Sequence, residues 1–150
     1  MKVADIGCGP GYLAIPLARS VGNDGRVYAI DVDEKAAKYL EESVKRLGLR
    51  NVEVRVAAAE SLDGLPDDHV DLSIMLHSLH HFSDKEKALR EAYRITKPGG
   101  RLVIIEPIKE RMLGHGTNIN EVSETLSSSG FRLETSERRL LTYRIIAWKD

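Results

Sequence analysis

Short apolar runs alternate along the chain with stretches in which apolar residues recur every three or four positions. The runs predict β-strands over residues 2–6, 26–31, 52–57, 70–76 and 101–106, followed by 131–137 and 141–149. The first five are almost continuously apolar, which is typical of parallel strands that are covered on both faces. The periodic stretches predict a helix after each of these five, so the expected order is β-α-β-α-β-α-β-α-β-α-β-β.

Helix boundaries are predicted from capping residues and glycines. The glycine-rich stretch VADIGCGPGY leads into a first helix over residues 13–21. The remaining signals are Asp33 and Gly48 at the ends of the second helix, a Ser83–Glu86 capping box, a turn at residues 97–100, and Asn120 and Gly130 around the last helix. Together they predict a doubly wound, Rossmann-like α/β fold with a seven-stranded, mostly parallel sheet whose last strand runs antiparallel.

The composition excludes several classes of protein. A chain of 150 residues can bury a single core, so we expect one domain over residues 1–150. A net charge of −1 gives no general basic surface for nucleic acid, and no apolar run reaches the roughly 20 residues of a membrane span. Cys8 is the single cysteine, so neither a disulfide framework nor a multi-cysteine metal site is expected. Because the N-terminus lacks the apolar segment of a signal peptide, the expected location is the cytoplasm.

Gly7, Gly9 and Gly11 lie between the first predicted strand and the first predicted helix, where sheets of this kind bind ligands. Asp31 ends the second strand, where an acid can accept hydrogen bonds from both hydroxyls of a ribose. The spacing G-x-G-x-x-A satisfies a dinucleotide fingerprint, so NAD is one candidate ligand. Asp5 disfavours NAD, because a carboxylate two residues before the loop would repel a pyrophosphate and attract an ammonium group. S-Adenosylmethionine has an ammonium group, a ribose diol and no phosphate, and it fits better.

Four segments, VADIGCGPGYLAIPLA, VYAIDVDEKA, AAAESLDGLPDDHVDLSIMLHSLHHF and KPGGRLVIIEP, resemble the successive motifs of class I S-adenosylmethionine-dependent methyltransferases. The most similar branch is that of the ubiquinone/menaquinone C-methyltransferases and their small-molecule relatives. The resemblance covers nearly the whole chain and implies S-adenosylmethionine as the cofactor. The binding residues that it implies are Asp5, Gly7, Cys8, Gly9 and Gly11 in the methionine-binding loop, Asp31 at the ribose, Val32, Ala59 and Glu60 beside the adenine, and Leu76 and His77 where the methyl group faces its acceptor.

The chain departs from the family pattern in three places. Ala58 stands where relatives often have an adenine-contacting Asp, so the adenine amino group loses a partner or uses Glu60. The stretch between Glu106 and Asn120 is short, which trims a segment that covers the substrate. The first predicted strand begins near Lys2, whereas relatives carry one or two helices before it. We therefore expect the N-terminal lid helices to be absent and the cofactor cleft to be open on one side.

Three histidines, His77, His80 and His81, cluster just after the fourth predicted strand, with Asp84 nearby. A metal site is disfavoured, because no cysteine or second cluster accompanies them. His77 and His81 are the candidates for a general base or for positioning the substrate, and a purely structural role is the alternative.

The predicted C-terminal hairpin is mildly basic, with Arg132, Arg138, Arg139, Arg144 and Lys149. This pattern favours a solvated face, and a weak site for an anionic substrate is the alternative.

The expected reaction is in-line transfer of a methyl group from S-adenosylmethionine to a small-molecule or lipid-like acceptor. In such a reaction the protein mainly supplies alignment and a dry pocket. Two other functions stay open, namely a catalytically silent S-adenosylmethionine-binding module that acts with a partner subunit, and an NAD-dependent oxidoreductase. An open cleft also predicts a homodimer or a partner that covers it.

Overall fold

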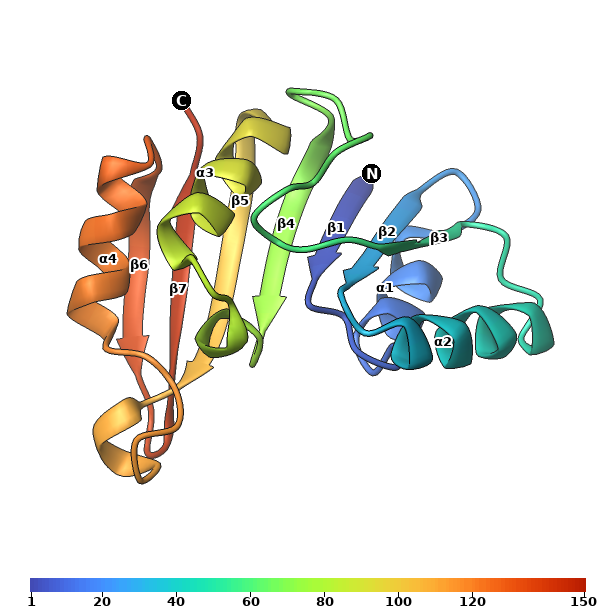
Figure 1. Ribbon diagram of the computed structural model, residues 1–150. Coiled ribbons are helices and arrows are strands. Elements are labelled where there is room, and N and C mark those ends of the chain that lie inside the picture. Colours follow the sequence, from blue (N-terminus) through green and yellow to red (C-terminus); the bar gives the residue numbers. More distant parts are fainter.

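A seven-stranded sheet in the order β3-β2-β1-β4-β5-β7-β6 runs through the computed structural model, which describes residues 1–150 (Figure 1). The strands are β1 (Lys2–Ile6), β2 (Arg26–Asp31), β3 (Val52–Val56), β4 (Val70–Leu76), β5 (Thr96–Pro107), β6 (Arg132–Arg138) and β7 (Thr142–Trp148). The first five pair in parallel, and β7 pairs antiparallel with both β5 and β6. The predicted fold class is confirmed. The chain returns from β3 to β4 on the other side of β1, so the carboxyl ends of β1 and β4 form a topological switch point.

Four helices cover the sheet, and two 3₁₀ turns follow strands on its carboxyl side. The helices are α1 (Ala14–Val21), α2 (Glu34–Arg46), α3 (Lys85–Ile95) and α4 (Ile119–Ser128), and the turns are η1 (Leu79–His81) and η2 (Lys109–Arg111). α1 and α2 pack on one face of β1, β2 and β3, whereas α3 and α4 pack beside each other against β5, β6 and β7 (Figure 1). No helix is long and apolar enough to cross a membrane.

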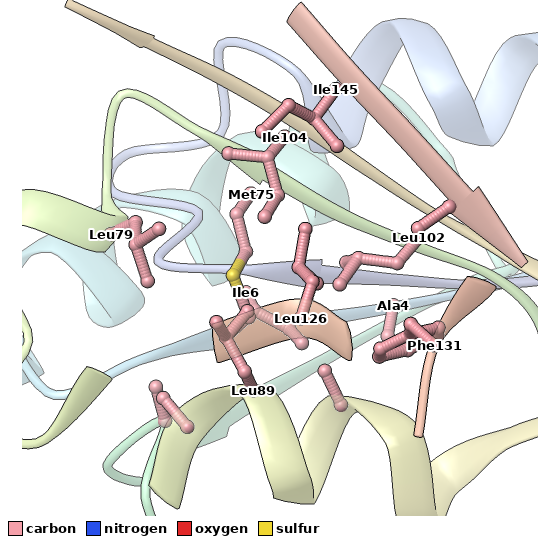
Figure 2. Close-up of a cluster of buried hydrophobic side chains, with 14 of the residues drawn as sticks. Ala4, Ile6, Met75, Leu79, Leu89, Leu102, Ile104, Leu126, Phe131 and Ile145 are labelled. Carbon is pink, nitrogen blue, oxygen red and sulfur yellow. The ribbon is translucent and has the colours of Figure 1, made fainter. Parts of the chain in front are cut away.

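Alternate side chains of the same strands enter two separate cores. Val27 and Ala29 of β2 join a small cluster with α1 and α2, while Tyr28 and Ile30 enter a larger cluster on the opposite face. Figure 2 shows the centre of the larger core between the sheet and the helices α3 and α4, with Ala4, Ile6, Met75, Leu79, Leu89, Leu102, Ile104, Leu126, Phe131 and Ile145 labelled. The period of two along the strands therefore assigns each apolar residue to one of the two cores.

The helix expected between the third and fourth strands is absent, and this prediction was wrong. Residues 57–69 form turns without helical hydrogen bonding. The segment contains Gly64, Pro66 and several aspartates, which disfavour a helix over so short a span. Leu62 and Leu65 are nonetheless buried in the larger core, so they cover the sheet face that a helix would have covered.

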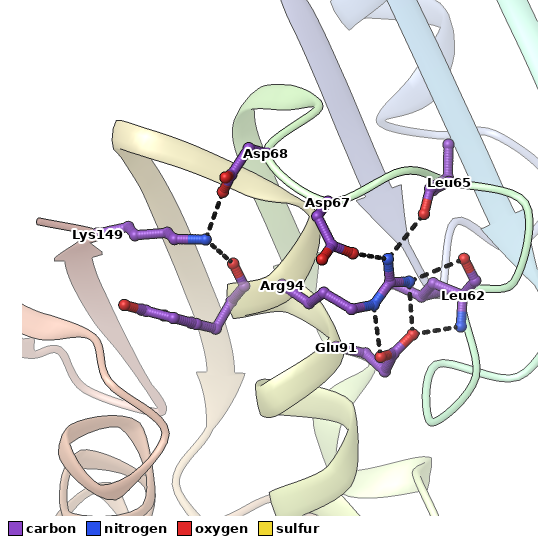
Figure 3. A network of polar contacts seen from close by, with 8 residues as sticks. Leu62, Leu65, Asp67, Asp68, Glu91, Arg94 and Lys149 are labelled. Carbon is purple, nitrogen blue, oxygen red and sulfur yellow. Dashed lines mark hydrogen bonds and ion pairs between the residues drawn. The ribbon is translucent and has the colours of Figure 1, made fainter.

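Side chains of α3 hold this loop in place. Figure 3 shows that the guanidinium of Arg94 donates to the carbonyls of Leu65 at 2.8 Å and Leu62 at 3.2 Å, and to the carboxylate of Asp67 at 2.8 Å. Glu91 accepts the N–H of Leu62 at 2.8 Å and also binds Arg94. Backbone groups that a helix would have paired internally are thus satisfied by side chains of another element.

Two cap predictions were wrong and one is confirmed. Asp33 caps α2 as expected, accepting the N–H groups two and three residues later. α3 is capped by Asp84 instead of Ser83, and α4 is capped by Asn118 instead of Asn120. Each actual cap is also a short polar side chain, placed within two residues of the predicted one, so the helix starts shift only slightly.

The expected turn at residues 97–100 lies inside β5 as an irregularity of the strand. Val70 pairs with Thr96 and Leu72 pairs with Arg101, so five steps of β5 face two steps of β4. The extra residues bulge out where the glycines allow it, and Gly99 has a φ of +76°. The turn chemistry was correctly predicted, but the strand begins before it rather than after it.

Candidate cofactor and acceptor site

The glycine loop between β1 and α1 is attached to the end of β2. The N–H groups of Gly7 and Cys8 both donate to the carbonyl of Ile30, at 2.8 and 3.0 Å. The N–H of Gly9 donates to Asp31 Oδ2 at 2.7 Å, and that of Gly11 bonds back within the loop. These four donors are satisfied inside the protein and are not presented to a ligand anion. The loop is therefore a poor pyrophosphate cradle, which agrees with the preference for a cofactor that has no phosphate.

The three glycines of the loop have positive φ angles for three different reasons. A Cβ on Gly7 would lie 2.3 Å from Ser78 Cβ, so this glycine lets the segment after β4 approach the loop. A Cβ on Gly11 would lie 2.2 Å from Leu40 Cδ1, so this glycine lets α2 pack against the loop. Beside Gly9 a Cβ would meet nothing within 4 Å, so the loop faces open space there. Of the three, Gly9 is the glycine that leaves room for a ligand.

Asp31 ties the loop to the following turn. Its Oδ2 accepts the N–H of Gly9, and its Oδ1 accepts the N–H of Asp33 at 2.9 Å. Each carboxylate oxygen has a second lone pair, so two further donors can be accepted. The side chain lines the cleft described below, where it is available to a diol.

Asp5 is almost fully buried in the sheet, with 1% of its surface exposed, and its Oδ2 has no hydrogen-bond partner. Loss of hydration on burial raises the pKa of this carboxyl to about 7, and the negative charge of Asp31 contributes in the same direction. The sequence interpretation treated Asp5 as a permanent anion. In the structure it is poised between its neutral and charged forms near neutral pH, and Oδ2 is left without a donor.

A cleft of about 520 Å³ opens at the switch point, within the size range of small-molecule sites. It is lined by the glycine loop, the end of β2, the segment after β3 and the segment after β4. The predicted site residues that line it are Gly7, Gly9, Asp31, Val32, Ala59, Glu60, His77 and His81. Asp5, Cys8, Gly11 and Leu76 do not line it. Val32 is 71% exposed, so one wall of the cleft offers a free apolar side chain.

Cys8 is a packing residue in this structure. Its side chain is buried in the smaller core, and burial, together with the charges of Asp5 and Asp31, raises the pKa of the thiol far above its ordinary value. A thiol in that setting stays protonated and is not a nucleophile.

The histidine segment after β4 has an unusual backbone and an internal support. His77 is exposed and has a φ of +52°, which is uncommon for a residue other than glycine. Its N–H donates to the carbonyl of Ile105 at 2.8 Å, so the strained residue is fixed to β5. His81 is also exposed, and its ring contacts that of His80 at a tilt of 41°, with 4.0 Å between the centroids.

Glu106, at the end of β5, holds this segment from inside the protein. It is fully buried, its Oε1 accepts the N–H of Leu79 at 2.8 Å, and its Oε2 accepts from His80 Nδ1 at 2.6 Å. His80 thus has its ring orientation set by a buried carboxylate and in turn supports His81 at the cleft. No group of three or more His, Cys, Asp or Glu side chains is arranged to hold a metal ion.

Several functional positions were missed from the sequence. Ser78 and Phe82 line the cleft, and the hydroxyl of Ser78 donates to the carbonyl of Ile6 at 2.8 Å. Glu106 had a usable signal, because it is an acid that ends an apolar strand, as Asp5 and Asp31 are. Nothing in the local sequence marks Phe82, which reaches the cleft through the turn of η1.

Residues 4–104 match the family described as a methyltransferase domain. The chain belongs to the class I S-adenosylmethionine-dependent methyltransferases. It is 40% identical over 105 residues to the ubiquinone/menaquinone biosynthesis C-methyltransferase UbiE of Enterobacter sp. (strain 638), across 69% of this chain and 41% of that protein. The methyltransferase chain therefore spans about two fifths of the length of the curated relatives that it matches.

Solved structures give the same family. A SAM-dependent methyltransferase from Aquifex aeolicus superimposes with a TM-score of 0.90 at 35% identity, covering 98% of this chain and 81% of that one. The [4+2]-cyclase SpnF superimposes with a TM-score of 0.82 at 28% identity, covering 91% of this chain and 52% of that one. These likenesses support neither an NAD-dependent oxidoreductase nor a catalytically silent module.

The residues of the cleft fit S-adenosylmethionine, the cofactor of this family. The space beside Gly9 is free, and Asp31 retains acceptor capacity for the hydroxyls of a ribose. Asp5 is buried and does not line the cleft, so its carboxyl can favour a positively charged group only from behind the lining residues or through the conformation of the loop. The apolar side chains of Val32 and Ala59 border the same cleft and suit an adenine ring.

Proposed function

We propose that this methyltransferase transfers the methyl group of S-adenosylmethionine to an apolar, lipid-like acceptor. The observation that carries the proposal is the convergence of three features on one cleft: the open space at Gly9, the carboxylate of Asp31 and the histidine segment after β4. The first two suit a cofactor, and the third lies where an acceptor would approach it. When bound, S-adenosylmethionine supplies an activated methyl group on a sulfonium.

Each side of the cleft has a distinct part in the proposal. Asp31 binds the ribose, Val32, Ala59 and Glu60 border the adenine, and Gly7 and Gly9 contact the methionine portion. Asp5 attracts the ammonium group, either directly or through the conformation of the loop. Cys8 and Gly11 shape the loop by packing, and Leu76 ends the strand that positions His77.

Two imidazoles line the acceptor side of the cleft, those of His77 and His81. A carbon acceptor must lose a proton when the new carbon–carbon bond forms, and in our proposal one of these imidazoles takes that proton. The leaving sulfur keeps the electron pair of the broken bond. His80 does not line the cleft; it acts on His81 through the contact between their rings, and Glu106 fixes the orientation of the His80 ring.

The names of the relatives support the proposed class of acceptor. They are named for C-methylation in ubiquinone and menaquinone biosynthesis, so we propose an aromatic carbon in a molecule with an apolar tail. We also propose that residues 1–150 form a single domain and that it acts in the cytoplasm. A second copy or a partner over the cleft would exclude water from it.

A radioactive methyl-transfer assay with the purified chain tests the proposal. Demethylated quinols with short isoprenoid tails should accept the label, and the His77→Ala and His81→Ala variants should show which imidazole the transfer needs. Calorimetry with S-adenosylhomocysteine is run in parallel. Binding of S-adenosylhomocysteine without methyl transfer to any acceptor would favour the silent module. Methyl transfer must be assayed directly, because SpnF has the same fold and is named a cyclase.

A partner over the cleft is tested separately by measuring the mass of the chain in solution. A dimer would support the proposed cover. A strict monomer that binds S-adenosylmethionine at low micromolar concentration would show that residues 108–117 close the site without help.

A further inference from the structure

Two loops project together beyond the carboxyl end of β5, at the lower left of Figure 1. One contains η2 and the residues after it, and the other is the turn between β6 and β7; we call residues 109–115 and 138–141 the basic tip. Arg111 Nη1 donates to the carbonyl of Leu140 at 2.6 Å, and the N–H of Ile108 donates to that of Leu141 at 2.9 Å. The two loops therefore form one surface.

The basic tip exposes several apolar side chains to solvent. Leu113 is 100% exposed and Leu140 is 80% exposed, and Leu141 and Met112 are 48% and 36% exposed. A leucine in full contact with water contributes nothing to the core. Single exposed apolar residues are common on proteins, but four on two adjoining loop ends mark a contact surface.

Cations surround these apolar residues. Lys109, Arg111, Arg138 and Arg139 belong to the tip, and none of them forms an ion pair with an acid. Its single acid, Glu110, is bound by the amide of Asn118. The chain as a whole has a net charge of −1, so the positive charge of the tip is local.

The basic tip and the cleft lie at the same edge of the sheet. The N–H of His77 at the cleft donates to the carbonyl of Ile105 in β5, and the basic tip begins at Lys109, just after the end of that strand. A surface that receives the tip therefore comes to face the acceptor side of the cleft.

We propose that the basic tip docks the protein on an anionic lipid bilayer. Leu113 and Leu140 enter the interface, and the guanidinium groups and Lys109 lie at the lipid phosphates, as in other proteins that combine apolar insertion with basic charge. The tip protrudes and its four cations have no acid partners, so an anionic bilayer, which offers phosphates on every side of an inserted loop, matches its charge. The docking itself stands apart from the proposed function, and only its use to collect a lipid-like acceptor rests on that function.

Sedimentation with vesicles tests the proposal. The full chain should partition onto vesicles of phosphatidylcholine with 30% phosphatidylglycerol and much less onto phosphatidylcholine alone, and salt should weaken the binding. Leu113→Ser and Leu140→Ser should each lower the partition coefficient about tenfold, equal to about 1.4 kcal/mol. Arg138→Gln with Arg139→Gln should lower it roughly thirtyfold, at about 1 kcal/mol for each cation.

Matched control variants lie on α2 and at the residue that ends it, in the other half of the molecule. Leu47 is 44% exposed, and Lys35 and Lys38 are exposed. Leu47→Ser and the Lys35→Gln/Lys38→Gln pair should change the partition coefficient less than twofold and threefold, respectively. Binding of S-adenosylhomocysteine by every variant verifies that the fold and the cofactor cleft are intact.

Equal partition onto neutral and anionic vesicles would overturn the proposal, and so would control variants that weaken binding as much as the tip variants. A solution dimer that Leu113→Ser converts to a monomer, without vesicle binding by the wild type, would assign the tip to a protein interface instead. Methyl transfer to a detergent-dispersed acceptor without vesicle binding would refute docking and leave the proposed function intact. Vesicle binding without cofactor binding would support docking and refute the proposed function.

Discussion

Replacing Asp5 with asparagine should make the protein without cofactor more stable at pH 8. Asp5 is 1% exposed, and the pKa of its carboxyl rises from the ordinary 3.8 to about 7 because burial removes its hydration and Asp31 is near. Above pH 7 the folded protein therefore contains a buried carboxylate whose Oδ2 has no donor. Asparagine has nearly the same shape and no charge at any of these pH values.

The sign and size follow from proton linkage. The folded state binds the proton more tightly than the unfolded state, so wild-type stability falls as the pH rises from about 4 to about 7. The gap between the two pKa values corresponds to about 4 kcal/mol, at about 1.36 kcal/mol per pKa unit. Relative to the wild type, Asp5→Asn should therefore gain up to about 4 kcal/mol between pH 4 and pH 8.

Urea denaturation at a series of pH values measures this difference. Asp71→Asn is a control of opposite sign, because a hydrogen bond from the N–H of Lys2, together with Lys97, lowers the pKa of Asp71. Asp71 therefore stabilises the folded state once it is ionised, and its amide variant should be less stable than the wild type at pH 7. A difference between Asp5→Asn and the wild type that does not change with pH would refute the assignment of Asp5 as a proton-binding buried group.

The same proton gives a prediction for the cofactor. If the charged form of Asp5 attracts the ammonium group of S-adenosylmethionine, affinity should rise with pH between 6 and 8 in the wild type, with proton release on binding. The Asp5→Asn variant should bind more weakly at pH 8 and lose this pH dependence. Calorimetry in two buffers of different ionisation enthalpy measures both effects, and equal proton release by the two proteins would contradict the prediction.

Three further predictions, which use five substitutions, separate packing from binding. Gly11→Ala should lower the free energy of unfolding by about 2–4 kcal/mol, because the new methyl group collides with α2. Gly9→Ala should lower it by only about 1 kcal/mol in thermal unfolding. Among the folded molecules, Gly9→Ala should weaken cofactor binding more than Gly11→Ala does. Asp31→Ala should weaken cofactor binding by about 1–3 kcal/mol in calorimetry, while Asp84→Ala, which removes the cap of α3, should leave the affinity unchanged. Arg94→Ala should lower stability by about 1–3 kcal/mol and speed amide exchange in residues 57–69, and unchanged exchange there would show that its hydrogen bonds do not hold the loop.

Local patterns determined the sheet and the place of the site. Sequence patterns predicted all seven strands to within a residue or two, apart from the start of β5. The first five form nearly continuous apolar runs because a buried parallel strand needs apolar side chains on both faces, whereas β6 is exposed along most of its length. The glycine loop and the acid at the end of β2 predicted the switch-point cleft, since both features depend on backbone conformation and on chain order. Asp33 was correctly predicted as a helix cap because a cap accepts hydrogen bonds from N–H groups only two and three residues away in the chain.

Contacts between distant residues decided the rest. Gly64 and Pro66 disfavour a helix over residues 57–69, but the loop there is held by Arg94 and Glu91, which are about 30 residues away in the chain, so no local pattern could show what holds it. Gly9 and Gly11 look alike in sequence, and only the position of α2 makes one of them a packing residue and the other an open edge of the cleft. The pKa of Asp5 and the support of His80 by Glu106 likewise depend on burial and on partners brought together by the sheet. Sequence periodicity records which face of an element is apolar, whereas hydration, charge proximity and free volume exist only once the elements have packed.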